Sequence, residues 1–352
     1  MTGRRPLRGP AALERQLLRQ HEGARPASPL YGRVIIAVLA DVRAGGECHR
    51  LLMPYAEEPP SNAVVLRFLA AVHRIVLDGR APALAAHYPS AGGTPGPGLE
   101  AAFLTAVAQH ADEVASGLVD GVQTNEVGRS AALLGGYLVV AAETGLPLRV
   151  LEIGASAGLN LRFDRFAYEA GGQVAGDAAS AVRFVEPWTG GGRPDLGVRL
   201  DVRERRGCDL RPIDPTSPEG RLRLRSYVWP DQVDRLARLE QAIDVAARVP
   251  VTVDRAAAPD WLDVHLATGR PGVATVVTHS IVMQYLSPHE QERMFAALGG
   301  AGIRATRRAP LAWLRMEAAG RTAEIRLTMW PGGRRRVLGT SNYHGPPVDW
   351  RG

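Results

Sequence analysis

Four short runs in the second half of the chain, each a candidate strand, end in residues that can bind a ligand or take a proton. These residues are Glu152, Gly154, Ser156 and Gly158 around the first run, Asp209 after the second, Asp254 after the third, and His279 with Ser280 after the fourth. Glycines let the backbone turn tightly and approach a ligand closely. Carboxylates accept hydrogen bonds from ribose hydroxyls or an adenine amino group. Together these groups satisfy the polar parts of an adenosine-type cofactor.

The loop Gly154-Ala155-Ser156-Ala157-Gly158 connects the first run to what we expect to be a helix. The free N–H groups of a helix N-terminus suit a carboxylate or a phosphate. We expect Asp209 to accept the ribose hydroxyls and Asp254 to bind the adenine ring. We expect His279 to be the base that removes a proton from a substrate, because an unperturbed imidazole titrates at a pKa of about 6.5.

A second polar cluster, Asn125, Glu126 and Arg129, lies at the start of an expected helix. A threonine cap and an early acidic residue are ordinary stabilisers of a helix start, so a structural role is the simpler interpretation. The density of polar groups at a domain junction favours a second hypothesis. In that hypothesis the three side chains close over the cofactor or the substrate and take part in catalysis.

The elements that position these residues follow from hydrophobic periodicity. Residues 1–145 show helical spacing and are predicted to form a helical N-terminal domain. Strands and helices then alternate over residues 146–352, with an inserted β-rich segment at 162–206. Such alternation predicts an α/β fold with a mostly parallel sheet and helices on both faces. Ligands bind such sheets at the carboxyl ends of the strands, where the candidate residues lie.

Composition narrows the class of protein. The chain has 352 residues, a net charge of +6 and a 45% hydrophobic content, which is ordinary for a globular protein. All of its basic residues are arginines, and we attribute this to compositional bias, so nucleic acid is not an expected partner. The two cysteines fit a reducing compartment, and no apolar run approaches the roughly 20 residues of a membrane span. We therefore expect a cytoplasmic protein, and the histidine spacings predict no metal site.

Several stretches resemble the motifs of class I S-adenosylmethionine (SAM)-dependent methyltransferases. The first motif resembles LEIGASAGLN (151–160), which includes Asn160, and the second-strand motif resembles RRGCDLRP (205–212). The third and fourth resemble VTVDRAA (251–257) and VVTHSIVMQYL (276–286). The resemblance implies a Rossmann-like methyltransferase fold, with SAM held by the glycine loop, Asn160, the strand-end acids and Ser280.

Over nearly its full length the chain also resembles the bacterial domain-of-unknown-function family 2332. The shared stretches are QTNEVGRSAALL (123–134), LEIGASAGLNLRFDRFAYE (151–169), YVWPDQ (227–232) and the segment around THS (278–280). The resemblance to that family implies no particular reaction.

Two departures from the methyltransferase pattern bear on the site. Ser156 stands where many methyltransferases have the middle glycine of the loop. The acid of the second strand usually follows the loop by about 20 residues. Asp209 comes much later, after the insert, whereas Glu169 comes rather early. We favour Asp209 because it ends a strand.

The preferred hypothesis is a SAM-dependent methyltransferase acting on an unidentified small molecule. One alternative is a serine hydrolase, because Gly154–Gly158 matches G-x-S-x-G and Ser156, Asp254 and His279 follow in the hydrolase order. The helical character of the preceding residues disfavours it, since that fold places several strands before the nucleophile. Another alternative is a non-catalytic relative that binds a nucleotide. The substrate and the oligomeric state stay open.

Overall fold

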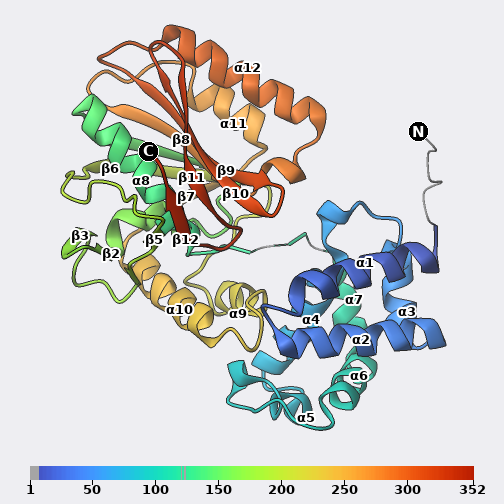
Figure 1. The fold of residues 1–352 in the computed structure, drawn as a ribbon. Coiled ribbons are helices and arrows are strands. Elements are labelled where there is room, and N and C mark those ends of the chain that lie inside the picture. Colours follow the sequence, from blue (N-terminus) through green and yellow to red (C-terminus); the bar gives the residue numbers. More distant parts are fainter. Residues whose placement is uncertain (1–7, 120, 123) are drawn as a thin grey trace. The chain divides into compact units, whose positions relative to one another are not determined.

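The structure of the protein is a computed structural model that describes residues 8–119, 121–122 and 124–352 (Figure 1). The chain divides into two compact units, one formed by Met1–Thr124 with Pro218–Ala237 and the other by Asn125–Ser217 with Arg238–Gly352. This division differs from the predicted boundary at 145. Helix α8 (Arg129–Thr144) packs on the strands of the second unit, and a later segment of the chain returns to the first unit.

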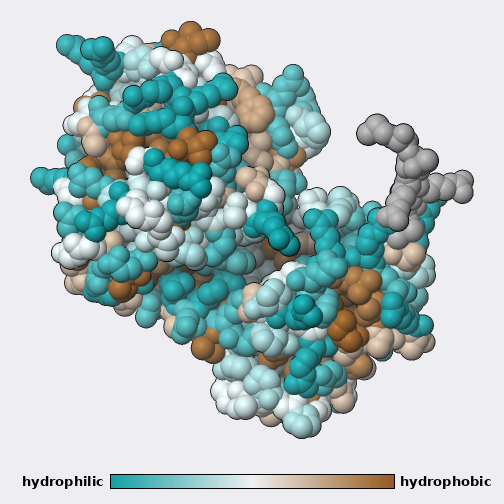
Figure 2. Space-filling model, in the orientation of Figure 1, coloured by the Kyte–Doolittle hydropathy of each residue, from teal (hydrophilic) through white to brown (hydrophobic). Residues whose placement is uncertain are grey.

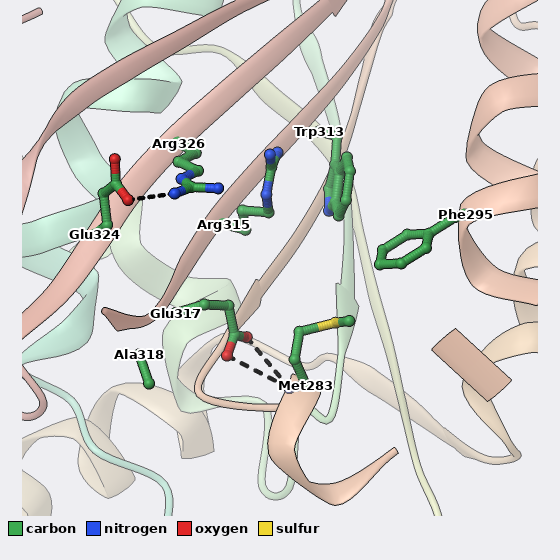
Figure 3. A pocket seen from close by; sticks show the side chains of 8 residues that line it. All are labelled: Met283, Phe295, Trp313, Arg315, Glu317, Ala318, Glu324 and Arg326. Carbon is green, nitrogen blue, oxygen red and sulfur yellow. Dashed lines mark hydrogen bonds and ion pairs between the residues drawn. The ribbon is translucent and has the colours of Figure 1, made fainter. Parts of the chain in front are cut away.

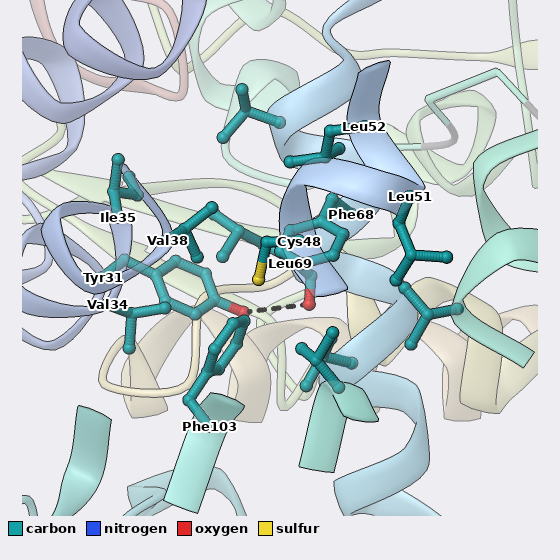
Figure 4. Packing of buried hydrophobic residues seen from close by; sticks show 14 of the residues in the cluster. Tyr31, Val34, Ile35, Val38, Cys48, Leu51, Leu52, Phe68, Leu69 and Phe103 are labelled. Carbon is teal, nitrogen blue, oxygen red and sulfur yellow. Dashed lines mark hydrogen bonds between the residues drawn. The ribbon is translucent and has the colours of Figure 1, made fainter. Parts of the chain in front are cut away.

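The first unit is helical, as its periodicity predicts. Its helices are α1 (Pro10–Ala24), α2 (Pro29–Ala44), α3 (Glu47–Leu52), α4 (Val64–Leu77), α5 (Pro82–Ala85), α6 (Leu99–Gln109), α7 (Ala111–Val119) and α9 (Pro218–Ser226), with 3-10 turns at Met53–Tyr55, Pro60–Asn62 and Pro89–Ala91. Helices α6 and α7 meet at His110. Figure 4 shows the apolar core between α2, α3, α4 and α6, where the Tyr31 hydroxyl donates to the carbonyl of Leu69 and the rings of Phe68 and Phe103 meet edge to face.

The returning segment completes this helical unit. The carboxylate of Asp231 accepts a hydrogen bond from Ser28 Oγ at 2.6 Å and one from the Leu30 N–H at 3.2 Å. Ser28 is the N-cap of α2, and its side chain accepts from the Tyr31 N–H. The buried imidazole of His73 lies 3.1 Å from the carbonyl of Ser226. These contacts connect positions 153 to 203 residues apart and explain why residues 218–237 belong with the first unit.

The second unit contains a nine-stranded sheet with the order β5-β12-β11-β10-β9-β8-β1-β6-β7. Its strands are β1 (Leu148–Ile153), β5 (Trp188–Thr189), β6 (Val202–Asp209), β7 (Thr252–Arg255), β8 (Ala274–Ser280), β9 (Leu311–Ala319), β10 (Thr322–Trp330), β11 (Arg334–Asn342) and β12 (Gly345–Trp350). The half from β7 to β9 is parallel, whereas β9 to β12 form an antiparallel meander. The predicted α/β class is confirmed, and the sheet is mixed.

Helices cover both faces of this sheet. Successive side chains of a strand point to opposite faces, so the residues that each helix touches identify its face. Helix α8 packs on β8 to β12, and Gly136 there lies against Leu314 of β9. Helices α11 (Ala258–His265) and α12 (Pro288–Arg304) pack over Leu151, Ile153 and Leu311 on the opposite face. We call these the α8 face and the α12 face.

The β-rich insert is confirmed. Strands β2 (Ala167–Ala170), β3 (Gln173–Gly176) and β4 (Arg183–Val185) form a separate small sheet with the order β3-β2-β4. The short strand β5 leaves the insert and pairs with β12 at the edge of the main sheet. Helix α10 (Val233–Arg248), which begins in the first unit, then connects the chain to β7.

The glycine loop does not lead into an α-helix. A seven-residue 3-10 segment, Leu159–Arg165, follows it, with non-helical backbone angles at Arg162. The expected helix N-terminus, with its free N–H donors, is therefore wrong. The start of α12, in contrast, has a capping box formed by Ser287 and Glu290.

The visible surface in Figure 2 is mostly hydrophilic, with separate apolar patches. One helical stretch in the described chain, Pro60–Leu77, is long and apolar enough to cross a membrane, with a mean hydropathy of 1.3. However, 61% of this stretch is buried within the protein, as in the core helix of a globular unit. It includes α4, whose side chains form much of the core in Figure 4.

Candidate functional site

Glu152 is the most unusual polar residue at the predicted sheet edge. It lies near the carboxyl end of β1, and only 4% of its surface is exposed. Its Oε2 atom is buried and accepts no hydrogen bond from any described residue. Because Leu151 and Ile153 pack on the α12 face, alternation places Glu152 on the α8 face. A buried carboxyl oxygen without a donor is rare and points to a ligand group that supplies one.

Burial determines the protonation of this carboxyl group. Loss of hydration raises the pKa of Glu152 to about 8, and the negative charge of Asp209 acts in the same direction. The cations of Arg129 and Arg162 oppose this rise. The side chain is therefore largely protonated at neutral pH, and a cationic ligand beside it would favour its ionised form.

The glycine loop turns through left-handed backbone at three of its five residues. Gly154 and Gly158 both have φ of 65°, and Ser156 has φ of 52°. A Cβ atom on Gly154 would lie 2.6 Å from Val282 Cγ2, so any other residue there would have to displace Val282. Ile281, which follows β8, also has a positive φ of 55°. Such backbone is costly for a serine or a β-branched residue, and its presence at the ends of adjacent strands is typical of a functional edge.

The N–H groups of this loop are mostly engaged within the protein. The Ala155 N–H donates to the Cys208 carbonyl, and the Gly158 N–H donates to the Ala155 carbonyl. The Ser156 N–H donates to Asp209 Oδ2, and the Leu159 N–H donates to Asn125 Oδ1. A phosphate cradle needs such donors aimed at the ligand. The arrangement therefore disfavours a phosphate ligand at this loop.

Asp209 ends β6 beside the loop, as predicted, but part of its hydrogen-bonding capacity is used. Its Oδ2 accepts from the Ser156 N–H at 2.9 Å, and its Oδ1 accepts from the Arg211 N–H at 2.8 Å. A carboxylate has about four acceptor positions, so both oxygens can still accept a hydroxyl. Glu169, the other candidate, lies on β2 in the small sheet and pairs with Arg183.

The polar residues before α8 are attached to the same loop. Asn125 accepts from Leu159, and Asn160 Nδ2 donates to the Glu126 carbonyl at 3.1 Å. Asn160 is 5% exposed, and its Oδ1 is a second buried oxygen without a described donor. The structure thus brings Asn125, Glu126 and Asn160 together with the glycine loop. Gln123, the first residue of the stretch QTNEVGRSAALL, lies outside the described residues.

Arg129 connects this region to two further elements. Its Nη1 donates to the Ser280 carbonyl at the end of β8, and its Nε donates to the Tyr343 carbonyl in the β11–β12 turn. In the same turn His344 Nδ1 lies 3.4 Å from Glu126 Oε2. We call Asn125, Glu126, Arg129, Glu152, Asn160 and Asp209 the carboxyl-edge cluster. The β11–β12 turn was missed from the sequence because nothing local to it indicates contact with residues about 200 positions earlier.

Asp254 does not join the carboxyl-edge cluster. It lies beside Cys208 in the sheet, and Cys208 packs on the α12 face. Its carboxylate accepts two hydrogen bonds from Arg206, at 2.6 and 2.8 Å, and one from Trp261 Nε1 at 2.7 Å. These donors hold the pKa of Asp254 below its ordinary value. The geometry gives Asp254 a role in joining β6, β7 and α11 in place of the predicted contact with adenine.

His279 also points away from the cluster. It is fully buried. Its neighbour Thr278 pairs with Glu152 and shares the α8 face, and successive side chains of a strand point to opposite faces, so His279 lies on the α12 face. Its Nε2 accepts from Trp313 Nε1 at 2.9 Å, and its Nδ1 lies 2.7 Å from Glu317 Oε1. Tryptophan only donates, so Nε2 carries no proton and Nδ1 donates to the carboxylate. With both nitrogens engaged, the imidazole is a structural bridge, and the predicted catalytic base is not supported here.

The same contacts bear on the hydrolase alternative. A Ser-His-Asp triad needs the imidazole within hydrogen-bond reach of the serine and an acid on its other nitrogen. His279 is bonded to Trp313 and Glu317, and Asp254 is bonded to Arg206 and Trp261. The predicted triad of Ser156, Asp254 and His279 is therefore not assembled. Within the described residues no group of three or more His, Cys, Asp or Glu side chains could hold a metal ion.

Comparison with known proteins identifies the family but no activity. A family model described as an uncharacterized protein conserved in bacteria (DUF2332) matches residues 14–350. No curated protein and no solved structure matches the chain.

Proposed function

The chain belongs to the DUF2332 family, and from the geometry of its sheet edge we propose that it binds SAM and is a small-molecule methyltransferase. The observation that carries the proposal is the buried oxygen of Glu152, which lacks a donor at the carboxyl end of β1. SAM offers an ammonium and a sulfonium cation, and it contains no phosphate. These properties match a buried acid beside a loop whose N–H groups are mostly engaged.

Strand order supports the same assignment. From β7 to β9 the order β7-β6-β1-β8-β9 corresponds to 3-2-1-4-5 in the chain order of the parallel strands. This is the order of the Rossmann-like folds, and it places the switch point between β1 and β8. Glu152, the glycine loop and Ser280 all lie at the carboxyl ends of these two strands. Ligands of open α/β sheets bind at this position.

Each residue of the carboxyl-edge cluster then has a defined part. Glu152 would bind the cationic end of the cofactor, and Asp209 would accept the ribose hydroxyls with its remaining lone pairs. Asn125 and Glu126 hold the glycine loop through Leu159 and Asn160, so they are positioning residues. Arg129 joins the end of β8 to the β11–β12 turn through the carbonyls of Ser280 and Tyr343. When bound, SAM supplies an electrophilic methyl group, and the protein's main contribution is to orient the acceptor in line with it.

The first test is calorimetric titration of SAM and S-adenosylhomocysteine into the full chain and into Glu152→Gln, which keeps the shape and removes the charge. We expect about a tenfold or greater loss of SAM affinity, as for removal of a charged hydrogen bond. Glu143→Gln is the matched control, because Glu143 lies at the far end of α8 and pairs with Arg334 and Arg336. Absence of SAM binding by the wild-type protein at millimolar concentration would refute the proposal.

The two alternative functions, a serine hydrolase and a non-catalytic relative, predict different experimental results. Labelling by a fluorophosphonate that disappears in Ser156→Ala would favour a hydrolase. Binding of SAM without turnover on any panel of small-molecule acceptors would favour a non-catalytic relative of the fold.

A further inference from the structure

A separate cavity of about 180 Å³ opens on the α12 face of the sheet (Figure 3). It lies between β9, β10, α12 and the turn after β8, and its walls include Met283, Phe295, Trp313, Arg315, Glu317 and Arg326. Trp313, Arg315 and Glu317 alternate along β9, so they share this face. Glu152 lies on the opposite face, and the cavity is therefore distinct from the carboxyl-edge cluster.

Arg315 is a cation without an acidic partner in this cavity. Its guanidinium lies 3.8 Å from the centre of the Trp313 ring, and its Nη1 donates to Thr328 Oγ1 at 3.2 Å. No ion pair joins it to a carboxylate in the part of the chain that the structure describes. Burial, followed by the charges of Arg326 and Arg335, lowers the pKa of Arg315 to about 10. The side chain stays protonated at neutral pH, and an anion would relieve the cost of this half-buried charge.

The other charged groups of the cavity already have partners. Glu317 accepts from His279 Nδ1 and from the N–H groups of Val282 and Met283. Arg326 is bonded to Glu324. In Figure 3 the guanidinium of Arg315 lies at the end of the cavity away from Glu317, close to Arg326. An anion bound at that end would meet Arg315 away from the carboxylate of Glu317, and the Glu324 carboxylate at that end is paired with Arg326.

The apolar walls indicate what the rest of the ligand is. Phe295 from α12 and Met283 from the turn face the cavity, and the Phe295 and Trp313 ring centres lie 5.8 Å apart. The bond from Trp313 Nε1 to His279 Nε2 holds the indole ring in place. A cavity of about 150 Å³ lined by apolar side chains is large enough for benzene. Since this cavity has a volume of about 180 Å³, it fits a single ring with a small substituent.

We propose that this cavity binds a small aromatic carboxylate, with the carboxylate on Arg315 and the ring against Phe295 and Met283. Arginine presents a planar fork of donors that matches both oxygens of a carboxylate. The flat ring packs on the phenyl and thioether groups. This binding does not depend on SAM or on methyl transfer.

The test compares benzoate with benzamide, which has the same shape and no charge, by calorimetric titration into the full chain. We expect benzoate to bind at least about tenfold more tightly, because only the anion pairs with the guanidinium. Arg315→Gln is expected to lose about tenfold in benzoate affinity, and Arg315→Lys to lose part of it, since lysine keeps the charge without the fork. The matched control is Arg335→Gln, which removes an exposed charge that acts on Arg315 without lining the cavity.

Four results would overturn the inference: equal affinity for benzoate and benzamide, no benzoate binding at millimolar concentration, wild-type affinity in Arg315→Gln, or an equal loss in Arg335→Gln. Melting temperatures of the variants establish that they are folded. If Arg315→Gln does not fold, the comparison of the two ligands on the wild-type protein decides the question by itself.

Discussion

At the scale of single residues, the protein contains carboxyl groups in opposite situations. Asp254 is surrounded by donors from Arg206 and Trp261, whereas Glu152 Oε2 has none among the described residues. The first arrangement stabilises the ionised form and the fold. The second leaves a buried acid whose charged form is costly in the absence of a ligand, which is typical of a binding site.

The buried acid leads to a prediction about pH and stability. The folded carboxyl of Glu152 keeps its proton up to a pH of about 8, whereas the unfolded one loses it near 4.5. This group's contribution to the unfolding free energy is therefore full below pH 4.5 and is lost as pH rises through 8. We expect the unfolding free energy of the wild type to fall relative to Glu152→Gln over this range, by on the order of 4 kcal/mol. Urea denaturation of both proteins at pH 5, 7 and 9 measures it, and parallel pH profiles would contradict it.

At the scale of elements, the glycine loop is placed by contacts on both sides. The loop lies between the end of β6, through Asp209 and Ser156, and the segment before α8, through Asn125 and Leu159. The sequence identified the loop because glycine spacing is local. It did not reveal that a 3-10 segment follows, since that depends on the segment before α8, which reaches the loop only in the folded chain.

Two glycine substitutions separate backbone strain from packing, one at Gly145 after α8 and one at Gly154 in the glycine loop. Gly145→Ala places a Cβ in open space at a φ of 63°, whereas Gly154→Ala places one 2.6 Å from Val282 at a φ of 65°. We expect the first to cost about 1 kcal/mol, from left-handed backbone alone. The second adds a steric cost of about 1–3 kcal/mol and displaces the turn after β8. Thermal and urea unfolding measure the loss of unfolding free energy in both variants. Equal losses would show that Val282 moves aside at no energetic cost.

At the scale of the whole molecule, the chain forms two units whose boundaries do not follow a single cut in the sequence. Residues 218–237 belong to the helical unit although they lie between β6 and β7 of the sheet. Helical periodicity predicted the helices themselves. It did not indicate that residues 218–237 belong to the helical unit, because the unit in which a helix packs depends on residues distant in the sequence.

The returning segment has a measurable share in the stability of the helical unit. Asp231→Ala removes the acceptor of Ser28 Oγ and of the Leu30 N–H at the start of α2. We expect a loss of about 1–3 kcal/mol in unfolding free energy, because two partly buried donors lose their partner. Asp234→Ala, an equal change of charge at an exposed position three residues later, is the control and is expected to cost less than about 1 kcal/mol. Equal effects of the two substitutions would exclude this role of Asp231.

The sequence by itself determined β1, β6, β7 and β8, the glycine loop, the β-rich insert and the presence of Glu152 and Asp209 at strand ends. These features depend on residues close together in the chain. Only the tertiary structure decided which face each strand-end side chain occupies. Since the faces of a strand alternate at every residue, Glu152 lies on the α8 face while His279 and Asp254 lie on the α12 face. Register and the choice of covering helix are set by contacts across the whole chain, and no local pattern encodes them.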